Sequence, residues 1–72
     1  MVEIPNSAVD RIIRKSGASR VSKSAIIELR KELEDYGVEL SKMAVEIAMY
    51  AGKKTVEGDD VILAIRKLKM TS

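Results

Sequence analysis

The sequence predicts an all-α domain in which a short helix, a loop, a long central helix, a second loop and another short helix follow one another. Apolar residues recur at intervals of three and four through the long central segment, and two shorter periodic segments flank it. Gly17 and Gly52 follow the first two segments, where a helix commonly ends. With 72 residues, the chain is expected to form one domain, 1–72.

The first helix is expected over residues 7–16. Asn6 or Ser7 can serve as its N-cap, Asp10 is placed in its first turn, and Gly17 provides the C-terminal cap. Its buried face is expected to consist of three apolar side chains: Val9, Ile12 and Ile13.

The central helix is expected over residues 23–50, with Ser22 as N-cap and Gly52 as terminator. Gly37 in its middle costs about 1 kcal/mol relative to alanine, and it indicates either a close helix crossing or an ordinary surface position. Twenty-eight helical residues span roughly 42 Å, whereas a compact chain of this size is only about 30 Å across. The helix is therefore expected to need a second chain to cover it.

The last helix is expected over residues 59–69, with acidic residues in its first turn and basic residues in its last. It is apolar around much of its circumference, which indicates that it is covered on more than one side. Two chains whose long helices cross near their middles would satisfy this pattern, since each chain's short helices could fold over the partner's long helix.

The composition excludes several classes of function. The chain has no Cys and no His, which removes disulfides, the common zinc ligand sets, and catalysis by cysteine or imidazole. No segment is apolar enough to span a membrane, and the first residues do not resemble a signal peptide. We therefore expect a protein that is not an enzyme, has no metal or cofactor, and does not bind a membrane.

The charges are unevenly distributed, although the net charge is only +2. Five basic residues and no acidic residue lie between Arg11 and Lys23, and further basic residues follow Gly52 and end the last helix. The long helix has an excess of acidic residues. Positive charge is thus expected near the start of the chain and around the two loops.

Two loop-bearing segments, RIIRKSGASRVS and AGKKTVEGDDV, stand on either side of a long helix with LEDYG at its centre. In this order and at this separation, they resemble the histone fold of the small archaeal histones over nearly the whole chain. The resemblance implies a handshake homodimer, without enzymatic activity, that binds duplex DNA with little sequence preference and bends and compacts it. It also implies a cytoplasmic protein located on the chromosome.

The resemblance places the first loop of one subunit beside the second loop of the other, and it assigns an arginine of the first helix to the minor groove. The residues expected to bind DNA are Arg11, Arg14, Arg20, Val21, Ser22, Lys54, Thr55 and Val56. Cationic side chains, hydroxyl groups and helix N-termini are the groups that bind phosphate. The basic residues of the first helix could equally form a solvated face, and Ser22 would cap the long helix with or without DNA.

The resemblance implies two further sets of contacts. Lys53 and Asp60 correspond to a structural ion pair that shapes the second loop. Dimers of the family join side by side through positions matched by Ile47, Tyr50, Asp60 and Leu63. Many archaeal histones carry Arg-His where this chain has Met49-Tyr50, so tetramers or longer assemblies on DNA depend here on a tyrosine.

The departures leave a second hypothesis open. Val38, Met49 and Glu57 stand where basic residues are frequent in the family, which lowers the electrostatic part of DNA affinity. The alternative is a histone-fold interaction subunit that pairs with a different chain, such as another histone or a member of a transcription or chromosome-associated complex. The stoichiometry of the folded protein distinguishes the two.

Overall fold

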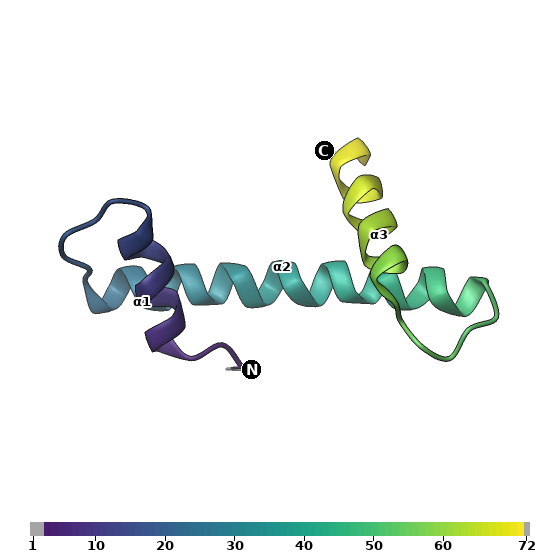
Figure 1. Ribbon diagram of the computed structural model, residues 1–72, viewed down its shortest axis with the longest axis horizontal. Helices are drawn as coiled ribbons and strands as arrows, with labels where there is room; N and C mark the ends of the chain where they lie inside the picture. The colour runs from purple at the N-terminus through teal and green to yellow at the C-terminus, as the bar shows by residue number, and fades with distance from the viewer. Residues whose placement is uncertain (1–2, 72) are drawn as a thin grey trace. The chain divides into compact units, whose positions relative to one another are not determined.

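The computed structural model describes residues 3–71, which form three helices and no strand. These are α1 (Asn6–Lys15), α2 (Lys23–Tyr50) and α3 (Gly58–Thr71), and Figure 1 shows them along the chain. The all-α prediction is confirmed. The chain divides into two compact halves, Met1–Tyr36 and Gly37–Ser72, with α2 running from one into the other. Within the described residues, none of the helices combines the length and the apolar content needed to cross a lipid bilayer.

In the N-terminal half, α1 begins one residue earlier than expected. Pro5 is its N-cap, and the Pro5 carbonyl accepts hydrogen bonds from the N–H groups of Ala8 (3.1 Å) and Val9 (3.3 Å). Proline fits there because a residue in this position has extended backbone angles, and no side chain caps the helix. Asp10 therefore lies beyond the first turn, not in it.

The buried face of α1 is narrower than expected. Val9 is fully buried and Ile13 is half-buried, but Ile12 remains 48% exposed within the single chain. The helix ends at Lys15 with Ser16 as its C-cap, and Gly17 follows with a φ of 113°, which suits glycine, and with its N–H donating to the Arg14 carbonyl at 3.0 Å.

The segment before α1 is fastened to α2. Oε2 of Glu34 accepts hydrogen bonds from the backbone N–H groups of Ile4 (2.9 Å) and Glu3 (2.6 Å), and Arg30 donates to the Asn6 side chain. The bond from Ile4, followed by the bond from Glu3, holds the pKa of the Glu34 carboxyl below its ordinary value. The start of α1 is thus held by a charged group on α2.

In the C-terminal half, α3 crosses the last part of α2 on small side chains (Figure 1). Ala44 and Ala48 of α2 and Ala64 of α3 are almost completely buried. α3 extends beyond the expected range at both ends, since Gly58 is its first residue and Thr71 its last.

The end of α2 is a Schellman motif. Gly52 has a φ of 75°, its N–H donates to the Met49 carbonyl at 2.9 Å, and the N–H of Lys53 donates to the Ala48 carbonyl at 2.9 Å. This double cap fixes the backbone at the residue that begins the second loop. The side chain of Lys53 consequently starts from a defined position.

Candidate functional site

Three of the residues expected to bind DNA lie together in the first loop. Arg20, Val21 and Ser22 line an open groove of about 470 Å³, whose other walls are Ile13 and Ala25. Arg20 is exposed, and it makes no hydrogen bond or ion pair with any residue from 3 to 71. Its guanidinium is therefore available to an external anion.

The groove ends at the start of α2, which a neutral side chain caps. Oγ of Ser22 accepts a hydrogen bond from the N–H of Ala25 at 3.2 Å, and the first turn of α2 contains no acidic residue. A hydroxyl cap satisfies one N–H without cancelling the partial positive charge of the helix N-terminus. Ser22 therefore has a structural role and also leaves this terminus attractive to phosphate.

Arg14 is placed differently from the other predicted DNA-binding residues. Its Nε lies 3.0 Å from Oδ2 of Asp10, and its Nη1 donates to the Ser19 carbonyl at 3.2 Å. The guanidinium thus connects α1 to the backbone of the first loop. Arg14 positions the loop, and part of its positive charge is offset by Asp10.

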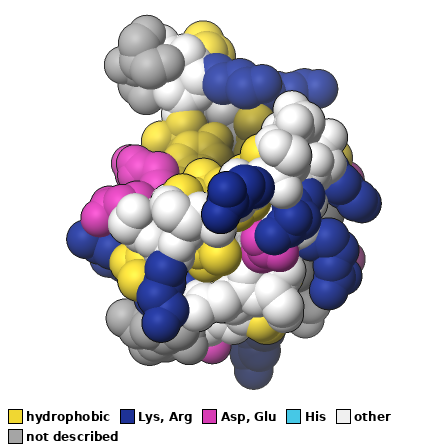
Figure 2. All heavy atoms as spheres, turned by 90° about the vertical axis from the view of Figure 1, so that its left-hand side faces the viewer, with side chains coloured by type: hydrophobic (Ala, Val, Ile, Leu, Met, Phe, Trp, Pro, Cys, Tyr) yellow, Lys and Arg dark blue, Asp and Glu magenta, His cyan; other side chains and the backbone are white. Residues whose placement is uncertain are grey.

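Basic side chains gather on the face toward which the first loop points (Figure 2, dark blue). The exposed basic residues of this region without a hydrogen bond or ion pair among residues 3–71 are Arg11, Lys15, Arg20 and Lys23. This part of the molecule can attract an extended polyanion.

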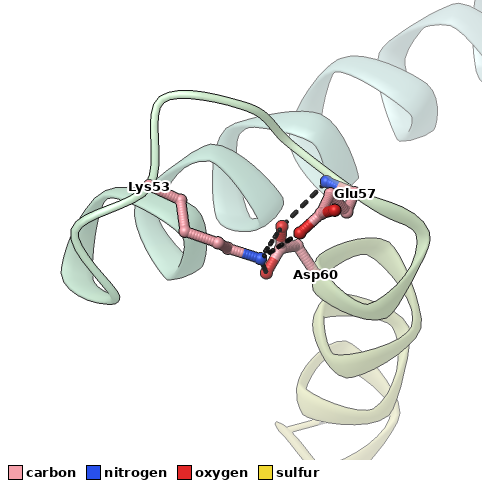
Figure 3. Close-up of polar contacts among 3 residues, drawn as sticks. All are labelled: Lys53, Glu57 and Asp60. Atoms are coloured by element: carbon pink, nitrogen blue, oxygen red, sulfur yellow. Dashed lines mark hydrogen bonds and ion pairs between the residues drawn. The ribbon is translucent and has the colours of Figure 1, made fainter.

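The second loop contains a cluster of one base and two acids (Figure 3). Nζ of Lys53 lies 3.0 Å from Oδ1 and 2.9 Å from Oδ2 of Asp60, and 3.0 Å from Oε1 of Glu57. The structure therefore brings Lys53 and Asp60 together and adds Glu57 to them. The hydrogen bonds that Lys53 donates to Asp60, and then to Glu57, raise the pKa of Lys53 above its ordinary value.

Asp60 also caps α3. The N–H of Glu57, the residue before the helix, donates to Oδ2 of Asp60 at 2.8 Å, which is one half of a capping box. This backbone bond, followed by the Lys53 ammonium, holds the pKa of Asp60 below its ordinary value. Only 4% of Asp60 is exposed, so it acts within the loop.

The remaining predicted residues of the second loop, Lys54, Thr55 and Val56, are all exposed. None of their side chains has a hydrogen bond or ion pair to residues 3–71. Lys54 is thus the cation of this loop that is available to an external anion.

The positions expected to join dimers are only partly gathered. Ile47, Tyr50 and Leu63 line one open groove of about 460 Å³, together with Met43, Glu46, Ala51 and Lys67. Tyr50 is 97% exposed beside this groove. Asp60 does not line it, because its carboxylate is committed to Lys53 and to the start of α3.

Three acidic partners of the loops and of the N-terminal segment were not expected from the sequence: Asp10, Glu34 and Glu57. Asp10–Arg14 has the i,i+4 spacing at which opposite charges meet on a helix, so for this pair a signal was present. Lys53 and Glu57 are also four residues apart, but they lie in the loop between α2 and α3, where this spacing predicts no contact. The contacts of Glu34 join residues about 30 positions apart, and no local pattern indicates them.

Within the described range, no group of three or more carboxylate, imidazole or thiol side chains is placed to hold a metal ion. Each loop offers an exposed cation and a hydroxyl group, and the first loop also leads into a helix start without acidic residues. Such a surface binds anions by charge and hydrogen bonding.

Comparison with known proteins gives a consistent result. Residues 2–65 match the family described as histone-like transcription factor (CBF/NF-Y) and archaeal histone. The chain is 48% identical over 66 residues to a subunit of the archaeal histone HAN1 of Thermococcus zilligii, and 38% identical over 66 residues to probable archaeal histone 3 of Methanocaldococcus jannaschii. Each match covers 92% of this chain and 98% of the relative. A histone-like protein of Mus musculus is 35% identical over 65 residues, which is 89% of this chain and 62% of that protein.

Proposed function

Because the chain belongs to the family of histone-like transcription factors and archaeal histones, we propose that it binds duplex DNA as a homodimer and bends and compacts it. The observation that carries this proposal is the first loop, where the unpaired Arg20 stands beside an α2 N-terminus capped by a neutral hydroxyl. Binding of this kind reads the phosphate backbone and has little sequence preference. The protein is expected on the chromosome and has no enzymatic role.

The proposed contacts with DNA are of several kinds. Arg20 and Lys54 supply charge to phosphates, while Ser22 and Thr55 supply hydroxyl donors at the same places. Val21 and Val56, which lie in the loops, would offer their backbone N–H groups to phosphate oxygens. Arg11, exposed on α1, is suited to the narrow minor groove, whose negative potential attracts arginine.

Dimerisation is supported by the small core of the single chain. Val9, Ala44, Ala48 and Ala64 are its buried hydrophobic residues within the described range, whereas many large apolar side chains are more than a third exposed. Those on the helices and outside the groove of Tyr50 and Leu63 include Ile12, Ile27, Tyr36, Val38, Val45 and Ile62. A second copy crossing α2 would cover much of this surface, and apolar area removed from water stabilises the pair by about 25 cal/mol per Å².

Association of dimers on DNA is proposed through the groove that Ile47, Tyr50 and Leu63 line. The exposed ring of Tyr50 can enter a partner's groove and add apolar contact area and a hydroxyl. Asp60 is expected to support this surface indirectly, by holding α3 in place.

The test of DNA binding removes one available cation from each loop. Arg20→Ala combined with Lys54→Ala should weaken binding to every random-sequence duplex. For each pair of loops, the first loop of one subunit with the second loop of the other, the slope of log affinity against log salt should become shallower by about 1–2 units. A matched control is Lys31→Ala with Lys42→Ala, which makes the same charge change on α2. Equal losses in the two variants, measured by gel-shift titration, would reject the loops as the DNA contacts.

The test of the dimer uses Gly37. Apart from the neighbouring residues and the backbone of its own helical turns, no atom of the described chain lies within 4 Å of a Cβ built there, so alanine should stabilise a lone chain by about 1 kcal/mol through helix propensity. A partner helix crossing at Gly37 would leave no room for the methyl group. We expect Gly37→Ala to lower the thermal stability and to weaken the dimer in sedimentation; a more stable protein with unchanged mass would contradict the crossing.

Association between dimers is tested separately. Tyr50→Ala and Leu63→Ala should reduce the size of complexes on long DNA and leave the dimer itself intact. Sedimentation of variant and parent complexes measures this difference, and identical complex sizes would count against the groove.

A second candidate function is supported by the family description, which also covers transcription factors, and by the low net charge. In that case the chain would pair with a different histone-fold chain. A lone chain that aggregates and is rescued by such a partner would favour this candidate; a stable homodimer that binds random DNA favours the first.

A further inference from the structure

Of the two lysines in the second loop, Lys53 has all its hydrogen-bond donors occupied by neighbouring carboxylates. The ammonium group of Lys53 has three N–H donors, and three carboxylate oxygens of Asp60 and Glu57 lie within 3.0 Å of its nitrogen. Figure 3 shows the lysine side chain reaching both acids. An outside phosphate would have to displace a carboxylate to reach this nitrogen.

The two carboxylates are not equivalent. Asp60 is 4% exposed and also accepts the N–H that starts α3, so its contacts shape the loop. The side chain of Glu57 is 61% exposed, and its one hydrogen bond within residues 3–71 is to Lys53. Exposed ion pairs add little to stability, so the main effect of Glu57 is on the local charge.

That local charge is unfavourable to phosphate. Lys53 and Lys54 are followed by three acids around the beginning of α3, Glu57, Asp59 and Asp60, and two of these acids contact Lys53. The acids also offset the partial positive charge at this helix N-terminus, in contrast to the start of α2.

We infer that Glu57 sets the affinity of the protein for DNA by keeping Lys53 from the phosphates. This inference rests on the proposed DNA binding and adds a residue that opposes it. When Glu57 is neutral, Lys53 keeps its contact with Asp60 and can turn one donor to a phosphate. The loop then offers two cations to the backbone instead of one.

The test compares Glu57→Gln with Asp59→Asn in gel-shift titrations on random duplex DNA. Both remove one negative charge near the start of α3, but Asp59 makes no contact with Lys53. Glu57→Gln should bind more tightly than both parent and control, and each recruited phosphate contact should steepen the salt slope by about 0.9. For one contact, its advantage over the parent should therefore shrink about 3.5-fold between roughly 50 and 200 mM salt.

The outcomes separate this inference from the one on which it rests. A parent that binds, with Glu57→Gln and Asp59→Asn giving the same affinity and salt slope, would overturn the role of Glu57 alone. Failure of parent and variant to bind any duplex would overturn both. Thermal unfolding of Glu57→Gln should match that of the parent, so a change in binding cannot arise from a loss of fold.

Discussion

The two loops solve the same structural problem with different chemistry. Each follows a helix that ends at a glycine with positive φ, and each leads into a new helix. Before α2 the cap is the hydroxyl of Ser22, whereas before α3 it is the carboxylate of Asp60, which also binds Lys53. The first loop therefore keeps its positive charge for a ligand, and the second uses much of its charge for its own shape.

The difference shows that a basic side chain near a loop is available to DNA only if acidic or carbonyl groups of the protein do not already bind it. Beside the first loop, Arg14 at the end of α1 donates to Asp10 and to the Ser19 carbonyl, whereas Arg20 in the loop has no such partner among residues 3–71. In the second, Lys53 is taken and Lys54 is left over. Each loop holds one cation for structure and leaves one exposed.

The largest effect is expected from Asp60→Asn, which removes the buried charge of the second loop. The variant leaves Lys53 without its main partner, and the Tm should fall by several degrees in thermal unfolding followed by circular dichroism. The control is Asp59→Asn, an exposed neighbour without such contacts, whose Tm should stay close to that of the parent. Equal changes in the two would contradict a structural role for the buried carboxylate.

The contribution of Asp60 to the stability of the second loop also depends on pH. Its folded pKa lies below the ordinary value of 3.8, so its contribution to stability is present above that pH and is lost as the pH falls through the lower folded pKa. The Tm of the parent should drop more steeply with acidification than that of Asp60→Asn.

Substitutions of Ser22 convert the first loop toward the chemistry of the second. Ser22→Ala should cost about 1 kcal/mol, because the N–H of Ala25 loses its cap. Ser22→Asp should keep the stability, since aspartate caps equally well, but its charge should weaken DNA binding. Urea unfolding measures the change in stability, and gel-shift titration measures the change in DNA affinity. An unchanged DNA affinity of Ser22→Asp would contradict the claim that the neutral cap keeps the first loop attractive to phosphate.

A smaller and local effect is expected from Glu34→Gln, which weakens the attachment of residues before α1. The neutral amide is a poorer acceptor than the carboxylate, so the amide hydrogens of Glu3 and Ile4 should exchange faster with solvent. Glu32→Gln, an exposed change on the same helix, is the control and should leave both exchange rates unaltered. The folded pKa of Glu34 is lowered, so protonating its carboxyl in acid should lower the protection factors of these two amides in the parent, measured against the intrinsic exchange rate at each pH.

The smallest effect is expected from Asp10→Asn. The Asp10–Arg14 pair is an exposed i,i+4 contact, which typically contributes about 0.3–0.5 kcal/mol. The variant should be almost as stable as the parent in urea and should bind DNA slightly more tightly, because the charge of Arg14 is no longer offset. A large loss of stability would instead show that Arg14 depends on Asp10 to hold the first loop.

The sequence was sufficient for the helix order, because a spacing of three and four and the two terminating glycines are local signals. It placed the N-cap of α1 at Asn6 or Ser7, whereas the carbonyl of Pro5 starts the helix. The expectation that Ile12 is buried failed for the single chain, since one face of a short helix need not be fully covered. The engagement of Arg14 and the double role of Asp60 depend on side-chain geometry, which spacing alone does not determine.

The alanine-rich core has a consequence for how the protein behaves in a cell. Among its described residues, the single chain buries only Val9, three alanines and Asp60, so in the proposed dimer much of the folding free energy would come from association. In the proposed dimer, the fraction of folded protein then rises with its abundance. Dilute chains would be open to proteolysis, and DNA would protect the chains it holds together. The amount of this protein on the chromosome would thus regulate its own lifetime.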